Sequence, residues 1–107
     1  MAIDVRSRLG IDDSALADFC RKWQIVRLEL FGSALREDFR PDSDVDLLVT
    51  FAEDAPWSLL DIVHLEGELS DLLGRKAEIA ERRAIEQSDN PFRRRRILNS
   101  AQPLYAA

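Results

Sequence analysis

The sequence predicts an α/β (α+β) fold in which a small mixed β-sheet is flanked by helices. Apolar residues recur at helical spacing in segments 12–23 and 58–74, and two short apolar runs, 25–31 and 44–51, are each bounded by turn residues. Helical and extended segments alternate along the chain, and this order is typical of a sheet covered by helices.

The first expected helix begins after the acidic and Ser residues at 12–14, which supply an N-cap. Its apolar stripe follows the spacing i, i+3, i+4 and i+7 and consists of Leu16, Phe19, Cys20 and Trp23. Residues 25–31 are rich in β-forming side chains and end at Gly32, so they predict a strand. On that strand Val26, Leu28 and Leu30 would share one face.

Residues 32–36 predict a short turn or helix, and Pro41 marks a second turn. Residues 44–51 then predict a strand that becomes apolar on both faces after its first residues. A strand of this kind lies inside a sheet that is covered on both sides.

The longest expected helix begins at Ser58, which forms a capping-box pattern with Asp61, and it ends at Gly74. Its apolar stripe consists of Leu59, Ile62, Leu65, Leu69, Leu72 and Leu73. Residues 75–80 predict a short strand, Pro91 begins another helix, and residues 103–105 predict a final edge strand.

The length of 107 residues is sufficient for one domain and too small for two. We expect a single domain over residues 11–107, preceded by an N-terminal extension of residues 1–10. No apolar run approaches the roughly 18 residues of a membrane helix, the N-terminus has no apolar signal core, and Cys20 is the one cysteine. These features predict a cytoplasmic protein without a membrane partner.

Charge is distributed unevenly along the chain. The formal net charge is −5, yet residues 82–107 carry six Arg against only two acidic residues, Glu86 and Asp89. The rest of the chain is therefore strongly acidic. An acidic body repels nucleic acid unless metal ions intervene, so nucleic acid is disfavoured as a partner.

The most informative pattern joins Gly32-Ser33, after the first strand, to Asp44-x-Asp46 at the start of the second. Side chains two apart on a strand project from the same face, so the two carboxylates would lie roughly 6–7 Å apart along the chain. Such carboxylates hold Mg²⁺ together with phosphate oxygens and water. Gly32 would let the backbone approach a ligand closely, and the amides at Ser33 could bind a polyphosphate. Each half alone is usually an ordinary turn or a solvated strand end, but the combination favours phosphoryl transfer.

The spacing Gly32-Ser33-x10-Asp44-x-Asp46 resembles the signature of the DNA polymerase β-like nucleotidyltransferase superfamily. The flanking residues 31–36 and 43–49 resemble its stand-alone minimal nucleotidyltransferases (MNT), and the resemblance runs from about Ile11 to Tyr105. It implies the polymerase β-like nucleotidyltransferase fold. It also implies an antitoxin and Mg-dependent protein adenylyltransferase, which transfers AMP from ATP to a tyrosine of a cognate HEPN ribonuclease toxin and so silences it.

The resemblance also implies a role for each candidate residue. Asp44 and Asp46 would hold two Mg²⁺ ions, with Glu78 as third carboxylate and metal ligand. Gly32 and Ser33 would bind the β- and γ-phosphates of ATP, and Arg36 could reach the triphosphate.

Two positions depart from the pattern of the family. Glu78 stands where Asp is usual, and its longer side chain moves the carboxylate by more than about 1 Å, a displacement that can cost about a hundredfold in rate. Glu37 stands where Gly often follows the Arg. Glu78 also has an alternative reading as a solvated strand carboxylate, and Arg36 as a surface residue paired with an acidic neighbour.

Three functions remain open from the sequence. The first is AMP transfer to a toxin, in a hetero-oligomer with it. The second is a non-catalytic antitoxin of the same fold that neutralises the toxin by binding alone. The third is transfer to a small acceptor, such as an antibiotic hydroxyl. We expect the acceptor to be brought by a protein partner, because a chain of this length has no room for an added acceptor domain.

The remaining conspicuous side chains have simpler interpretations. Cys20 is expected in the core, and Tyr105 is expected to pack at an edge strand. The large aromatic side chains Trp23, Trp57 and Phe92 are expected either in the core or on a surface that contacts a partner. His64 is expected to have no catalytic role. The run 93–96 of four Arg cannot line one surface, because successive helical residues point about 100° apart. It predicts either a solvated helix or contacts of some of the four with an acidic partner or phosphate.

Overall fold

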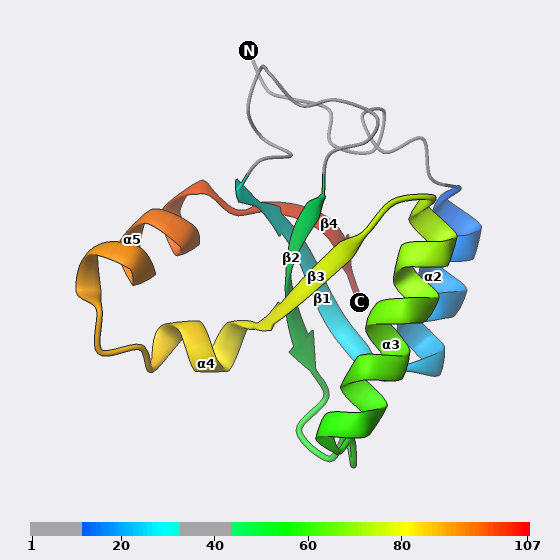
Figure 1. Ribbon diagram of the computed structural model, residues 1–107. Coiled ribbons are helices and arrows are strands. Elements are labelled where there is room, and N and C mark those ends of the chain that lie inside the picture. The colour runs from blue at the N-terminus through cyan, green and yellow to red at the C-terminus, as the bar shows by residue number, and fades with distance from the viewer. Residues whose placement is uncertain (1–11, 33–43) are drawn as a thin grey trace.

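The computed structural model describes residues 12–32 and 44–107 (Figure 1). Helices and strands alternate in the described part of the chain, as the sequence predicts. In chain order the elements are α2 (Asp13–Lys22), β1 (Ile25–Phe31), β2 (Val45–Phe51), α3 (Leu59–Leu73), β3 (Ala77–Glu81), α4 (Arg82–Glu86), α5 (Pro91–Ser100) and β4 (Gln102–Ala106).

The strands form one four-stranded mixed sheet in the order β3-β2-β1-β4. β1 pairs antiparallel with β2 and β4, whereas β2 and β3 are parallel. The parallel pair is connected through α3, because two parallel neighbours need a crossover. The mixed sheet flanked by helices confirms the predicted fold class.

The helices cover opposite faces of this sheet (Figure 1). The larger core lies on the face covered by α2 and α3, where Leu47, Val49 and Leu65 are fully buried. On the other face Leu48 packs with Ile85 of α4 and Ile97 of α5. Because consecutive residues of β2 enter two different cores, the strand is apolar on both faces, as predicted.

The predicted helix ends are confirmed by their capping contacts. The side chain of Asp12 accepts a hydrogen bond from the backbone N–H of Ser14, and Ser58 and Asp61 form a capping box at the start of α3. Gly74 ends α3 with a left-handed φ of 69°, and Pro91 begins α5. These local signals fix helix ends because they supply partners for backbone groups that the helix leaves free.

Four details differ from the expectations. Val26 is 38% exposed, because a register shift between Ile25 and Arg27 turns Ile25 into the core instead. Leu59, at the first turn of α3, is 81% exposed. Phe92 is 82% exposed, since it lies about 140° around α5 from the buried Ile97. The five-residue helix α4 was not predicted.

The two tryptophans connect α2 to the start of α3. Their rings meet edge to face at 5.0 Å, and the Trp57 indole donates to the carbonyl of Trp23 at 2.7 Å. Both are partly buried, and Trp23 packs against the larger core, which confirms its core role. Across the described residues, no helix has the length and apolar character needed to cross a membrane.

Candidate functional site

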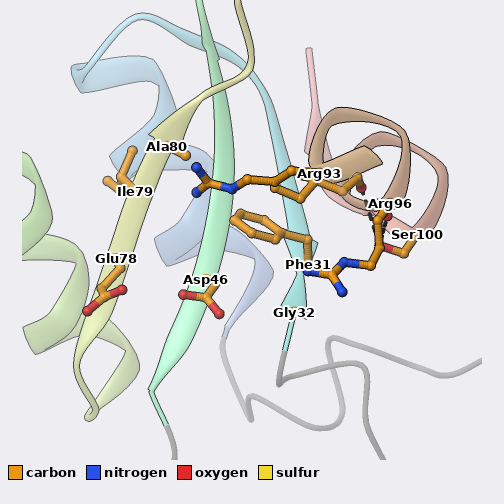
Figure 2. A pocket seen from close by; sticks show the side chains of 10 residues that line it. Phe31, Gly32, Asp46, Glu78, Ile79, Ala80, Arg93, Arg96 and Ser100 are labelled. Atoms are coloured by element: carbon orange, nitrogen blue, oxygen red, sulfur yellow. Dashed lines mark hydrogen bonds between the residues drawn. The ribbon is translucent and has the colours of Figure 1, made fainter. Parts of the chain in front are cut away.

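A cavity of about 770 Å³ opens between the sheet and α5 (Figure 2). Its size falls within the range of small-molecule binding sites, about 300–1,000 Å³. The lining residues come from β1, β2, β3 and α5 and are Phe31, Gly32, Asp46, Glu78, Ile79, Ala80, Arg93, Arg96, Ile97 and Ser100.

Two of the predicted carboxylates lie side by side in this cavity. Asp46 and Glu78 are register partners on the parallel strands β2 and β3. Val45 and Leu47 point into the α2 and α3 core, so Asp46 between them points to the opposite face. Figure 2 shows both carboxylates directed to the same side of the sheet.

The strand that carries Glu78 is anchored by α3. The N–H of Ala77 donates to the hydroxyl of Ser70, and the N–H of Ile79 donates to the carboxylate of Glu66, both at 2.9 Å. These bonds fix the backbone on both sides of Glu78. The Glu78 side chain is 54% exposed, and its carboxylate lies 3.4 Å from the ammonium group of Lys76.

Gly32 lies directly against the Asp46 carboxylate. Its φ is +72°, in the left-handed region, and a Cβ at this position would lie 2.6 Å from Oδ2 of Asp46. Any side chain here would therefore displace the carboxylate. The predicted proximity of the glycine turn to Asp46 is present in the fold.

The other predicted site residues are not brought into this cavity by the described structure. Asp44 lies just before β2, is exposed and does not line the cavity. In the ranges 12–32 and 44–107, no group of three or more His, Cys, Asp or Glu is arranged to hold a metal ion. Ser33 and Arg36, together with Glu37, lie outside the described residues.

The donor set that is present nevertheless suits a hard cation. Asp46 and Glu78 offer carboxylate oxygens, which Mg²⁺ prefers, and Mg²⁺ needs only one or two protein carboxylates when phosphates and water complete its coordination. The two side chains therefore fit a site in which a metal ion is bound together with a phosphorylated substrate.

Two cavity residues, Arg93 and Arg96, were not assigned to the site from the sequence. They are three apart on α5, so they lie one above the other on the same face of the helix. The spacing was visible in the run of four Arg. The sequence does not show which face of α5 points toward the cavity, so these two arginines could not be selected from the four.

An ion pair is buried beside the site. Glu29 is 2% exposed, and its carboxylate accepts from Nη1 of Arg82 at 2.5 Å and lies 3.4 Å from Nε of Arg27. Arg82 also lies 3.6 Å from the Glu86 carboxylate. This network ties α4 to β1 and satisfies a carboxylate that would otherwise be costly to bury.

Titratable groups elsewhere are accounted for by local contacts. The hydrogen bond from Lys22 lowers the pKa of Glu68, assisted by the indole of Trp23. Burial raises the pKa of the Cys20 thiol to about 12, which makes it inert as a nucleophile at neutral pH and confirms its core role. His64 is exposed and does not line the cavity.

The family model described as "Nucleotidyltransferase domain" matches residues 13–104, nearly the whole chain. The chain belongs to this nucleotidyltransferase family. The identification made from the motif spacing is thereby confirmed.

Individual nucleotidyltransferases agree with the assignment. A relative from Methanocaldococcus jannaschii, provisionally named a protein adenylyltransferase, is 37% identical over 76 residues, which cover 71% of this chain and 72% of the relative. A solved structure, provisionally described as a minimal nucleotidyltransferase, is 35% identical with a TM-score of 0.65 and covers 95% of this chain and 97% of its own.

A solved structure of low sequence identity shares the fold. A chain from the complex of tri-AMPylated HEPN toxin with MNT antitoxin from Shewanella oneidensis has a TM-score of 0.61 at 14% identity. The match covers 96% of this chain and 73% of that chain. The two proteins therefore share the nucleotidyltransferase fold.

Proposed function

We propose that this nucleotidyltransferase is an antitoxin that transfers AMP from ATP to a tyrosine of a cognate HEPN toxin and thereby neutralises it. Support comes from its family, from a relative named as a protein adenylyltransferase, and from the shared fold with a chain of a complex that contains an AMPylated toxin. The observation that carries the proposal is the pairing of Asp46 and Glu78 beside Gly32 in one cavity.

In the proposed reaction, the tyrosine oxygen attacks the α-phosphorus of ATP, a new P–O bond forms, and pyrophosphate leaves. Glu78 would accept the phenolic proton or orient the hydroxyl. Its partial exposure and its position in the cavity lining support this role. The backbone at Gly32 approaches Asp46 without a side chain, which lets this carboxylate keep its position at the cavity wall.

The proposal includes Mg²⁺ as a cofactor, with two ions expected. Asp46 and Glu78 would hold it together with Asp44, and it would supply charge neutralisation on the triphosphate and activation of the attacking oxygen. Ser33 and Arg36 are proposed to contact the phosphates. The working complex is a hetero-oligomer with the toxin in the cytoplasm.

The decisive experiment measures transfer of label from α-labelled ATP to the co-purified partner. The double variant Asp44→Asn, Asp46→Asn is expected to lose the transfer, and EDTA is expected to abolish it in the wild type. The matched control is Asp54→Asn, Asp71→Asn, which removes two exposed carboxylates that do not line the cavity. Label transfer by the site variant at the control's rate would contradict the proposal.

A variant of Glu78 tests whether this carboxylate takes part in AMP transfer. Glu78→Gln is expected to reduce the transfer rate about a hundredfold, because it replaces the carboxylate that would act as a base with a neutral amide. Equal rates for Glu78→Gln and wild type would make Glu78 an ordinary surface carboxylate.

A growth assay tests the alternative of an antitoxin that acts by binding alone. Under the proposal, cells that express the toxin are rescued by wild type and not by the Asp44→Asn, Asp46→Asn variant. Rescue by that variant, without label on the toxin, would favour neutralisation by occupancy. Transfer to a small alcohol in the absence of any partner would instead favour a small-acceptor enzyme.

A further inference from the structure

The cavity has an acidic wall and a basic wall. Asp46 and Glu78 lie on the strands, and Arg93 and Arg96 extend from α5 on either side of Phe31. Arg93 reaches across the sheet toward Ala80, and Arg96 lies on the side of Gly32 and Asp46 (Figure 2). The carboxylates can serve a cation, as described above. The two guanidinium groups have no role in that assignment.

Neither guanidinium is neutralised by a carboxylate of the described residues. Other arginines do have partners: Arg82 is paired with Glu29, Arg21 with Asp18, and Arg94 donates to the carbonyl of Ser88. Within the part of the chain that the structure describes, Arg93 and Arg96 form no such ion pair, although the cavity also contains Asp46 and Glu78. Two positive charges therefore line a cavity of binding-site size without a carboxylate partner in ranges 12–32 and 44–107.

The placement of this pair follows from how α5 is held. Asn90 caps the helix by accepting from the N–H of Arg93, and Ile97 is buried against Leu48 and Ile85. Because Ile97 faces the sheet, Arg93 and Arg96 both lie on the side of α5 that borders the cavity. Arg95, on the same helix, does not line the cavity.

We propose that Arg93 and Arg96 form a polyphosphate subsite, which binds the phosphate oxygens of the nucleoside triphosphate opposite the carboxylates. This assignment rests on the proposed nucleotide-transfer function. The planar guanidinium binds phosphate oxygens in pairs, and such charge-assisted bonds are among the strongest in proteins. A cavity lined only by Asp46 and Glu78 would repel a triphosphate, so a basic wall supplies attraction that the acidic wall lacks.

The subsite is tested first by binding of inorganic tripolyphosphate, measured by calorimetry in the presence of MgCl₂. The double variant Arg93→Gln, Arg96→Gln is expected to bind at least about tenfold more weakly, since bonds to charged groups are each worth a factor of ten or more. Arg95→Gln removes one charge from the same helix outside the cavity, and it is expected to bind as wild type does. Circular dichroism checks that all variants remain folded.

Two further variants distinguish bidentate recognition from charge alone. Arg93→Lys, Arg96→Lys keeps both charges and loses the planar fork, so its affinity for tripolyphosphate is expected to lie between wild type and the Gln variant. In the transfer assay, the Gln variant is expected to raise KM for ATP at least about tenfold while KM for the protein acceptor is unchanged.

The outcomes separate this inference from the proposed function. Tripolyphosphate binding that is absent in wild type, or equal in wild type and the Gln variant, overturns the subsite. A variant that weakens binding of the protein partner and leaves tripolyphosphate binding intact also overturns it, in favour of an acidic protein surface. If wild type binds tripolyphosphate through the arginines and transfers no AMP, the subsite stands and the proposed function fails.

Discussion

Substitution of Gly32 tests the contact on which the acidic wall depends. The variant Gly32→Ala adds a single Cβ at a residue whose φ is +72°, and this atom would lie 2.6 Å from Oδ2 of Asp46. Ordinary contact begins near 3.4 Å, so either the carboxylate or the turn must move by nearly 1 Å. Two separate costs follow, one for the backbone and one for the carboxylate.

The backbone cost lowers the stability of the fold, whereas the displaced carboxylate lowers the rate of the reaction. An L-residue in the left-handed region costs about 1–2 kcal/mol of folding free energy. The displaced Asp46 carboxylate is at the cavity wall, so its movement changes the site itself. A displacement of about 1 Å in the site, however, can reduce a rate about a hundredfold. We therefore expect modest destabilisation together with a large loss of AMP transfer.

Gly74 provides the matched control for this experiment. It has a φ of +69°, but an added Cβ there would meet no atom within 4 Å. Gly74→Ala carries the same backbone cost without touching the site. Urea unfolding of both variants and label transfer from ATP are the measurements. Transfer by Gly32→Ala at the rate of Gly74→Ala would show that the position of Asp46 does not limit the reaction, and the reasoning would be wrong.

Three more predictions concern the scaffold. Gly67→Ala lies in α3 with no atom within 4 Å of the added Cβ, so the free energy of unfolding in urea should rise by about 0.5–1 kcal/mol, and an unchanged value would contradict this. Arg82→Met leaves Arg27 as the remaining ion-pair partner of the buried Glu29 carboxylate among the described residues. The free energy of unfolding should therefore fall by about 3 kcal/mol. A loss below about 1 kcal/mol would mean that Arg27 compensates for the missing charge. The thiol of Cys20, fully buried with a pKa raised to about 12, should react with a thiol reagent at pH 8 only after denaturation, and rapid reaction of the native protein would show that the α2 core opens readily.

The main elements of the fold could be predicted because their signals are local. The strand at 25–31, the capping box of Ser58 and the stop at Gly74 all depend on residues within a few positions of one another. The predictions were wrong where the structure of a segment depends on contacts with residues distant in sequence, or where the segment is too short to show a pattern. The face of Val26 depends on a register shift against β2, and the helix α4 is too short to show a periodic pattern.

The acidic part of the site could be predicted from the alternation of side chains along the strands and from the spacing of the motif. The pairing of Asp46 with Glu78 depends on a parallel register that follows from the connection through α3, so the motif and the element order together indicate it. The arginines of α5 could not be assigned in the same way. Four consecutive Arg leave four possible faces, and only the packing of Ile97 selects one of them.

The two walls of the cavity therefore depend on different contacts that meet on one strand. Asp46 and Leu48 are two apart on β2 and share a face, so the strand that presents a carboxylate also supplies the apolar surface under α5. Leu48 holds Ile97, and Ile97 determines where Arg93 and Arg96 lie. The acidic wall is fixed by hydrogen-bonded register, while the basic wall is fixed by packing in a small cluster. The position of the basic wall relative to the acidic wall consequently depends on Leu48, which faces away from the larger core under α2 and α3.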